Sequence, residues 1–376
     1  MKKVLIVQNI PNPYRIPLFN ELHTQLQQKG IDMKVVFGAA TYKRRKFSLN
    51  LEDCHFDFEI LKSSLVYSGK SEIPFFGYNG LLRTVIKEKP DLIIIIGFSL
   101  GTFKLWLRSF FSSIPFLIWS GSITTKGRKD SPNRRRFRKA LAARAAGFVA
   151  YGTKAKEYLM ELGVPAEKIH IGINTTDISY FRERVKKVGR KLSGSRKNLL
   201  TIGYLTRGKR IDLLLQAIKH LSRIRQDFVL KIVGAGAIEE ELKQLAAELQ
   251  VEPYVSFEGF QQKTEIPGYL AEASVFLFPS EYDIWGLVLV EALAAGVPAI
   301  SSIHAGATMD LIVEGKTGFA MDFEDTEAVA KKIDWLLENP EEAARIGAAA
   351  QYHIETETSL AKSAAGFVQA IEENLN

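Results

Sequence analysis

The sequence contains a single cysteine, Cys54, among 376 residues. One cysteine cannot form an internal disulfide, and it excludes a zinc site built from cysteines. The longest apolar run, Leu92–Phe98, is far shorter than the roughly 20 residues that a membrane-spanning helix needs. A secretory signal is not expected, because Lys2 and Lys3 precede only a short apolar stretch. These absences favour a soluble cytoplasmic protein.

Several common catalytic patterns are also missing. The chain has no Asp-x-Asp pair, no Gly-x-Ser-x-Gly elbow and no phosphate-loop motif, and its histidines lack the spacing of metal ligands. The loop after the first predicted strand, residues 8–15, contains no glycine. A nicotinamide-dependent dehydrogenase would carry Gly-x-Gly-x-x-Gly there, so that class is disfavoured.

Charge is distributed unevenly along the chain. Residues 1–200 hold 36 Lys and Arg against 15 Asp and Glu, a balance of +21. Residues 201–376 hold 14 against 27, a balance of −13. An asymmetry this large indicates two modules with different partners.

Short apolar strands alternate with helical periodicity along both halves, which predicts parallel sheets covered by helices on both faces. The fold class we expect is α/β, with two doubly wound Rossmann-like domains facing a cleft. The segment 182–198 is polar, basic and rich in Gly and Ser, as a linker would be. The expected boundaries are 1–181 for the N-terminal domain, 182–198 for the linker, 199–357 for the C-terminal domain and 358–376 for a final helix.

The strongest motif is the segment 279–298, PSEYDIWGLVLVEALAAGVP, in which a strand leads through a polar loop and Gly286 into a helix. The first amides of a helix have no partner inside it, so a helix start after a glycine can bind an anion. Asp283 precedes this point and Glu291 follows it, with seven residues between them. Both carboxylates could accept hydrogen bonds from hydroxyls that flank a phosphate. The simpler interpretation is a capping aspartate and a solvated glutamate.

This segment resembles the donor-binding signature of retaining GT-B glycosyltransferases, the glycogen-synthase-like group 1 family. The signature has two Glu separated by seven residues, an aromatic–Gly pair between them and a helix that ends in Gly-x-Pro. Here Asp283 replaces the first Glu and Trp285 the usual Phe. The segment 305–319 resembles the family's next motif. The resemblance covers nearly the whole chain and is strongest over 199–323.

A second motif, the segment 203–217, has a strand that ends in a loop with Gly, Lys and Arg before a helix. In the family it resembles, an Arg and a Lys in this loop bind the diphosphate of the donor. Lys209 matches that Lys, and Tyr204 stands where the family has Arg. Arg207 could reach the same phosphates. The alternative interpretation of these cations is a solvated basic loop.

The resemblance implies a division of roles at the donor. Asp283 would bind the sugar hydroxyls and Glu291 the ribose, while Lys209 and Arg207 would hold the departing diphosphate. Lysine and arginine can stabilise that charge directly, so neither a metal nor a cofactor is expected. The other residues expected to contact the donor are Trp285, Gly286, Leu287, Val288, Gly259, Phe260 and Gln261.

The N-terminal half offers candidates for the acceptor or phosphate side. Tyr14 and Arg15 follow the first strand, and a surface position at a helix start is an equal alternative for Arg15. Ser120 and Ser122 end a later strand where many relatives place a histidine.

Two basic runs, 43–46 and 126–139, stand out in the same half. Such runs are often solvated faces, but they could also bind an anionic membrane or a pyrophosphate-linked acceptor. Nucleic acid is not expected as a partner, because no recognition motif is present and the aromatics are not interleaved with the cations.

The function implied is a retaining, metal-independent glycosyltransferase of the hexosyltransferase type. It would move a sugar from a nucleoside-diphosphate sugar to a glycan or lipid-linked acceptor in surface polysaccharide synthesis. The expected location is the cytoplasm, including the inner face of the membrane as a peripheral protein. The alternatives are a nucleotide-sugar epimerase of the same fold and a non-catalytic nucleotide-sugar binding protein.

Overall fold

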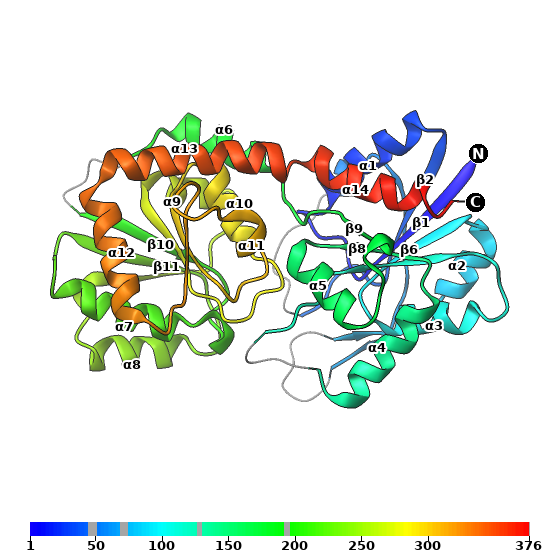
Figure 1. The fold of residues 1–376 in the computed structure, drawn as a ribbon, viewed down its shortest axis with the longest axis horizontal. Coiled ribbons are helices and arrows are strands. Elements are labelled where there is room, and N and C mark those ends of the chain that lie inside the picture. The colour runs from blue at the N-terminus through cyan, green and yellow to red at the C-terminus, as the bar shows by residue number, and fades with distance from the viewer. Residues whose placement is uncertain (44–50, 68–73, 126–129, 192–195, 376) are drawn as a thin grey trace. The chain divides into compact units, whose positions relative to one another are not determined.

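The computed structural model describes residues 1–43, 51–67, 74–125, 130–191 and 196–375. The chain divides into two compact units. The first is made of residues 1–124, 130–176 and 360–376, and the second mainly of residues 177–359. Both are α/β, and the sheet that forms the centre of each is parallel throughout (Figure 1).

The first unit is built on a seven-stranded sheet with the order β3-β2-β1-β6-β7-β8-β9. Its strands are apolar and largely β-branched, as strands buried on both faces must be. The order reverses direction between β1 and β6, which is the pattern of a doubly wound sheet. The strands are β1 Lys2–Gln8, β2 Ile31–Phe37, β3 Asp57–Ile60, β6 Leu92–Ile96, β7 Phe116–Ser120, β8 Gly147–Ala150 and β9 Ile169–Ile171, with a separate antiparallel pair, β4 Leu65–Val66 and β5 Phe75–Phe76.

Helices cover both faces of this sheet. Figure 1 shows α1 and α14 along one side and α3 and α4 along the other. Trp119 is fully buried beneath α1 and α14, where its ring meets Phe19 at 6.1 Å and Phe367 at 4.7 Å between centroids, both edge to face. The helices are α1 Ile16–Gln28, α2 Leu81–Glu88, α3 Leu100–Arg108, α4 Pro132–Arg144, α5 Thr153–Glu161 and α14 Leu360–Glu372, with 3₁₀ turns at Leu51–Asp53 and Ala166–Lys168.

The second unit has a six-stranded sheet with the order β12-β11-β10-β13-β14-β15, and its direction reverses between β10 and β13. Figure 1 shows α6, α9, α10 and α13 above this sheet and α7 and α8 below it. The strands are β10 Lys197–Ile202, β11 Phe228–Val233, β12 Val255–Gly259, β13 Ala273–Phe278, β14 Ala299–Ser302 and β15 Phe319–Met321. The helices are α6 Ile178–Val188, α7 Ile211–Ser222, α8 Glu239–Glu248, α9 Ile266–Glu272, α10 Leu287–Ala294, α11 Thr308–Leu311, α12 Thr326–Glu338 and α13 Pro340–Glu357, with 3₁₀ turns at Arg207–Lys209 and Glu252–Tyr254.

The expected α/β fold class is confirmed, because each unit is one doubly wound domain with a parallel sheet. The segment 182–198 is predicted to be a linker, but both ends of its described part lie in regular secondary structure. Helix α6 occupies its start, and β10 begins at Lys197. The Arg190 guanidinium donates to the carbonyls of Leu270 and Ala273 at 2.8 and 2.9 Å. Arg190 therefore packs on the second unit, to which residues 177–191 belong.

No helix in the described ranges of the chain is long and apolar enough to cross a membrane.

Candidate functional site

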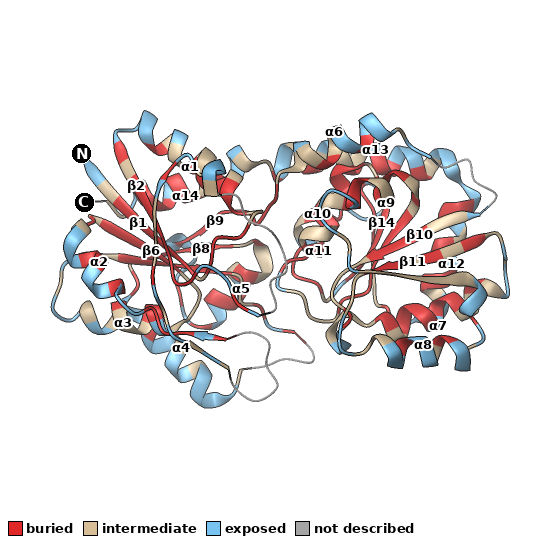
Figure 2. Cartoon of the chain, turned by 180° about the vertical axis from the view of Figure 1, so that it is seen from behind, coloured by how far each residue is buried: buried red, intermediate tan, exposed pale blue. Residues whose placement is uncertain are grey.

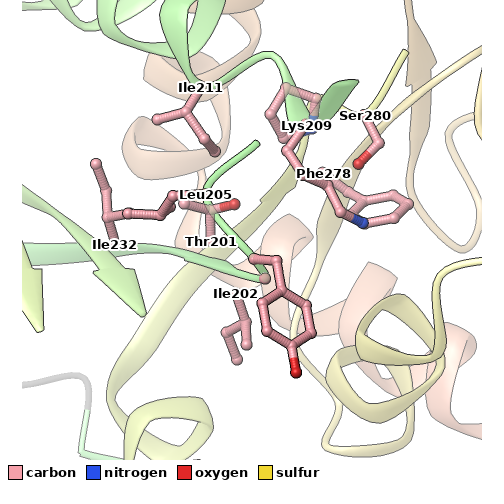
Figure 3. Close-up of a pocket in the computed structure, with 11 residues that line it drawn as sticks. Thr201, Ile202, Leu205, Lys209, Ile211, Ile232, Phe278 and Ser280 are labelled. Atoms are coloured by element: carbon pink, nitrogen blue, oxygen red, sulfur yellow. The ribbon is translucent and has the colours of Figure 1, made fainter. Parts of the chain in front are cut away.

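A pocket lies where the strand order of the second unit reverses, at the carboxyl ends of β10 and β13. This is the position at which open α/β sheets bind ligands. Figure 3 shows Lys209, Phe278 and Ser280 on one side of the pocket and Leu205, Ile211 and Ile232 on the other. The full lining is Thr201, Ile202, Gly203, Tyr204, Leu205, Lys209, Ile211, Ile232, Phe278, Pro279 and Ser280.

Lys209 supplies the positive charge of this pocket. It ends the 3₁₀ turn that follows β10, and its ammonium forms an ion pair with Asp283 Oδ2. The same ammonium lies 5.3 Å from the centre of the Phe278 ring. Both members of the pair are about one-fifth exposed. A ligand can therefore reach the lysine, while the acid and the ring hold it in place.

Asp283 is fixed by backbone contacts on both sides. Its Oδ1 accepts the N–H of Trp285 at 3.3 Å, and its carbonyl accepts the N–H of Gly306 at 2.9 Å. A Cβ at position 306 would lie 2.0 Å from the carbonyl oxygen of Ile284, so only glycine allows this approach. The motif downstream of the loop therefore clamps the loop that carries the acid.

Helix α10 begins at Gly286, and no side chain caps it. Gly286 has a left-handed backbone with φ of 100°, and a Cβ there would lie 2.5 Å from Phe278 Cζ. The Phe278 ring thus contacts the helix start and lies near the Lys209 ammonium. Amides at an uncapped helix start, together with a nearby lysine, make a site for an anion.

Glu291 lies one turn further along α10 and is partly buried. Burial raises the pKa of its carboxyl to about 8, and the charge of Lys263 acts weakly in the opposite direction. This carboxyl has no hydrogen bond or ion pair with any residue that the structure describes. At neutral pH the carboxyl is therefore mostly protonated and can donate to, or accept from, a ligand hydroxyl.

Two buried polar groups of the same loop have no hydrogen-bond partner in the part of the chain that the structure describes. They are Ser280 Oγ, which lines the pocket, and Trp285 Nε1. An unpaired buried polar group is costly, so each indicates a position that a ligand or a water satisfies. Sequence reasoning did not single out Ser280, although it directly follows the predicted strand in the motif.

Other donor-side residues lie differently. The Arg207 side chain is 80% exposed and pairs with Glu241 at 2.8 Å, so the structure does not bring it to Lys209. Phe260 is exposed at the end of β12, and Gln261 donates to the Glu258 carbonyl at 2.8 Å. Gly259 accepts the N–H of Gly234, which joins the ends of β12 and β11.

In the first unit the structure brings several predicted residues together at the ends of β1, β7 and β8. Arg15 is not a surface residue: it is 2% exposed. Its guanidinium carbon lies 4.2 Å from the Trp119 ring centre, 5.0 Å from that of Tyr151 and 5.2 Å from that of Tyr14. Among the described residues, its Nη1 has no hydrogen-bond partner. Sequence reasoning named Tyr14 but missed Trp119 and Tyr151, because Trp119 lies in β7 and Tyr151 follows β8, far from Arg15 in the sequence.

Ser120 is the last residue of β7, and Ser122 lies just beyond it. Ser120 is fully buried and its Oγ accepts the N–H of Ser122 at 3.2 Å. Of the two basic runs, residues 44–46 and 126–129 lie outside the described residues. Among the residues that the structure does describe, no three His, Cys, Asp or Glu side chains form a group that could hold a metal ion.

The chain is similar to known proteins in two respects: in sequence over residues 183–353, and in fold over nearly its whole length. Residues 183–353 match the family model for glycosyl transferases group 1. A putative colanic acid biosynthesis glycosyltransferase, WcaL of Salmonella typhimurium, is 30% identical over 182 residues, which are 46% of this chain and 43% of that protein. An uncharacterized glycosyltransferase of Haemophilus influenzae is 27% identical over 281 residues, 74% of this chain and 75% of that one.

Among solved structures, HepE of Anabaena in complex with UDP superposes with a TM-score of 0.78 at 19% identity, covering 99% of this chain and 100% of that one. At that identity the likeness shows the fold alone. The match to WcaL covers less than half of that protein's own length. Residues 183–353, which match the group 1 glycosyl transferase model, contain the pocket, the Lys209–Asp283 pair and helix α10.

Proposed function

We propose that the protein transfers a sugar from a nucleoside-diphosphate sugar to a glycan or lipid-linked acceptor in surface polysaccharide synthesis. The observation that carries this proposal is the anion site of the second unit, where Lys209 and the uncapped start of α10 lie around one phenylalanine ring. The match of residues 183–353 to the group 1 glycosyl transferase model supports the transfer, and the relative named for colanic acid biosynthesis supports the polysaccharide. The solved neighbour that binds UDP supports a nucleotide donor.

The donor would bind with its diphosphate between Lys209 and the first amides of α10. A phosphate there competes with Asp283 for the ammonium, so Asp283 becomes free to accept a sugar hydroxyl. Glu291, neutral at the start, can hydrogen-bond a ribose hydroxyl without leaving an unpaired charge in a buried position. Arg207 would join the phosphates only after giving up its exposed pair with Glu241.

The remaining donor contacts follow from position. Trp285, Gly286, Leu287 and Val288 form the loop and helix start around the diphosphate. Gly259, Phe260 and Gln261 lie at the same carboxyl edge of the sheet, where a base would extend from the ribose. On the first unit, Tyr14, Arg15, Ser120 and Ser122 are the candidates for the acceptor or its phosphate.

The chemical step we propose retains the configuration at the anomeric carbon. The bond from that carbon to the diphosphate oxygen breaks, and the acceptor oxygen forms the new bond on the same face. The acceptor proton passes to the departing phosphate. No residue of the site is placed as a covalent nucleophile, and Lys209 stabilises the charge that develops, so the proposal requires no metal.

The test is donor binding by thermal shift and calorimetry with UDP, GDP, ADP, TDP and their sugar conjugates, with and without EDTA. A ligand that binds only the folded protein raises the unfolding midpoint. We expect one nucleotide family to stabilise the protein equally with and without EDTA. Lys209→Met should weaken its binding by about tenfold or more, since a hydrogen bond to a charged group contributes roughly 1.5–3 kcal/mol.

The matched control is Lys219→Met, on the last turn of α7 outside the pocket lining. Equal nucleotide affinity in wild type and Lys209→Met would overturn the donor site, and loss of binding on adding EDTA would overturn metal independence. With the nucleotide known, turnover of the matching sugar conjugate with cell-envelope acceptors tests the transfer.

A further inference from the structure

The first unit carries an exposed apolar ridge beside its most basic helix. We use the name α3–α4 surface for α3, the turn 109–111 and α4. Leu107, Phe110, Phe111 and Phe137 are 45%, 52%, 93% and 43% exposed on it. Figure 2 shows α4 mostly exposed, with α3 beside it. Large apolar side chains clustered in this way mark an interaction site more often than scattered ones do.

The aromatic rings of this surface form a continuous chain between the two helices. Ring centroids are 5.8 Å apart for Phe137 and Phe103, 5.7 Å for Phe103 and Trp106, and 5.0 Å for Trp106 and Phe110. Phe103 and Trp106 are only partly buried. The ridge therefore has a supported aromatic base, and Phe111 is its most exposed point.

Cations accompany the ridge on α4. This helix, Pro132–Arg144, carries six Lys and Arg and no acid. The Arg144 guanidinium lies 4.3 Å from the Phe110 ring centre. Arg136 and Lys139 are exposed on α4 and have no ion pair with any acid in the described ranges. Arg138 and Arg134 share Asp130, and Arg135 pairs with Glu161 at 3.8 Å, so both acids that face α4 in the described ranges already have cation partners.

This combination selects among occupants. Aromatic residues at the level of lipid headgroups, flanked by Lys and Arg, are typical of proteins that lie on a bilayer. A symmetric contact with a second copy would place the same cations against one another, which like-charge repulsion disfavours. A negatively charged lipid surface neutralises these cations and also accommodates the rings.

We propose that the α3–α4 surface docks the protein onto an anionic lipid bilayer, with Phe110 and Phe111 entering the interface and the cations of α4 on the headgroups. The basic runs 43–46 and 126–139 already suggested an anionic membrane as a partner. Helix α4 contains residues 132–139 of the second run. The ridge adds an apolar anchor that charge alone did not indicate. This inference goes beyond the proposed sugar transfer, and its test uses neither donor nor acceptor.

The experiment is co-sedimentation of the full chain with vesicles of phosphatidylcholine alone or mixed with phosphatidylglycerol. We expect binding to the mixed vesicles only, decreasing as salt is raised. The double variant Arg136→Gln/Lys139→Gln should lower the partition coefficient by about tenfold or more, since each cation near such a surface is worth roughly 1 kcal/mol. Phe110→Ser/Phe111→Ser should lower it by a similar factor.

Two controls match these variants in exposure. Arg223→Gln/Lys316→Gln removes two exposed cations of the second unit, and Tyr352→Ser removes an aromatic that is 70% exposed on α13. Neither should change vesicle binding. Binding that is equal on neutral vesicles, or unchanged in both test variants, would overturn the proposal. Concentration-dependent dimers that the Phe variant abolishes, without vesicle binding, would instead assign the ridge to a second copy. Donor-nucleotide stabilisation of the same variants reports separately on the proposed function.

Discussion

At the residue scale, the ion pair of Lys209 and Asp283 holds a cation and an acid at one pocket, and a ligand can still replace either partner. Both side chains are partly exposed, so their attraction is screened and a phosphate can compete for the lysine. Glu291 differs, because its carboxyl has no cation partner among the described residues and burial raises its pKa. The site therefore holds one acid in an ion pair and one acid that burial keeps mostly neutral.

The raised pKa of Glu291 has a consequence for stability. Unfolding exposes the carboxyl, which then releases its proton near its ordinary pKa of 4.5, whereas the folded protein keeps it until about 8. Between these values the folded state binds more protons, so stability contributed by this group decreases as pH rises. Glu291→Gln should remove this slope while it keeps the size of the side chain.

The measurement is urea unfolding of wild type and Glu291→Gln at about pH 5 and about pH 8. We expect the free energy of unfolding of wild type to fall relative to the variant as pH rises. Glu355→Gln serves as a control, since Glu355 lies on another helix, α13, and pairs with Arg182. A parallel pH dependence in wild type and Glu291→Gln would contradict the buried, protonated state.

At the element scale, the start of α10 depends on one glycine for two separate reasons. Its φ of 100° is strained for any residue with a Cβ, and the Phe278 ring occupies the space where that Cβ would go. Gly315 shares only the first reason, because its φ is 68° and no atom lies within 4 Å of its Cβ position. The two positions separate backbone strain from the contact.

Gly286→Ala should therefore destabilise the second unit more than Gly315→Ala does. Left-handed strain costs roughly 1–2 kcal/mol at each position, and the contact with Phe278 adds to it at 286 only. Chemical denaturation of both variants measures the difference. Equal losses of unfolding free energy in the two variants would show that Phe278 moves aside freely.

Elements with strong local signals were predicted within a few residues. Leu18, Phe19, Leu22 and Leu26 have helical spacing and predict a first helix over 17–29, and α1 is Ile16–Gln28. The sequence also predicts a helix over 137–146, but α4 begins at Pro132, because Ser131 accepts the Arg134 amide and proline fits the first turn. Helix α13 was missed, although Ile346, Ala350 and Ile354 have helical spacing on its buried face.

At the scale of the whole molecule, the end of the chain completes the unit in which the chain begins. Helix α14 belongs to the first unit, where it packs on α1 and its Ser363 hydroxyl donates to the Ile173 carbonyl at 2.7 Å. Its Phe367 closes the core over Trp119. The first sheet therefore lacks part of its cover until residues 360–372 are present.

Phe367→Ala should destabilise the first unit by about 3–5 kcal/mol, the usual cost of removing a buried phenylalanine. Hydrogen exchange of the β7 and β8 amides measures this loss separately from the second unit, whose β10 and β13 amides should keep their protection. Tyr352→Ala, at an exposed position on α13, should leave both sets unchanged. Loss of protection in β10 and β13 to the same extent would show that the two units unfold together.

The sequence by itself determined the class of each half and the donor-side motif. Apolar strands followed by amphipathic helices permit little but a parallel, doubly wound sheet, and the segment from Pro279 to Pro298 carries its glycine and acids in fixed spacing. These signals are local, since each depends on residues that are close together in the chain. The sequence also indicated Lys209 and Asp283 as candidates for donor binding, but it did not show that they form an ion pair.

Only the tertiary structure decided what depends on strands far apart in the sequence. Lys209 meets Asp283 because β10 and β13 are neighbours at the point where the strand order reverses. Arg15 is buried beside the rings of Trp119, which lies in β7, and Tyr151, which follows β8. Arg207 pairs with Glu241 and does not line the pocket. Strand order and the directions of side chains come from packing of the whole sheet, which no local pattern of residues encodes.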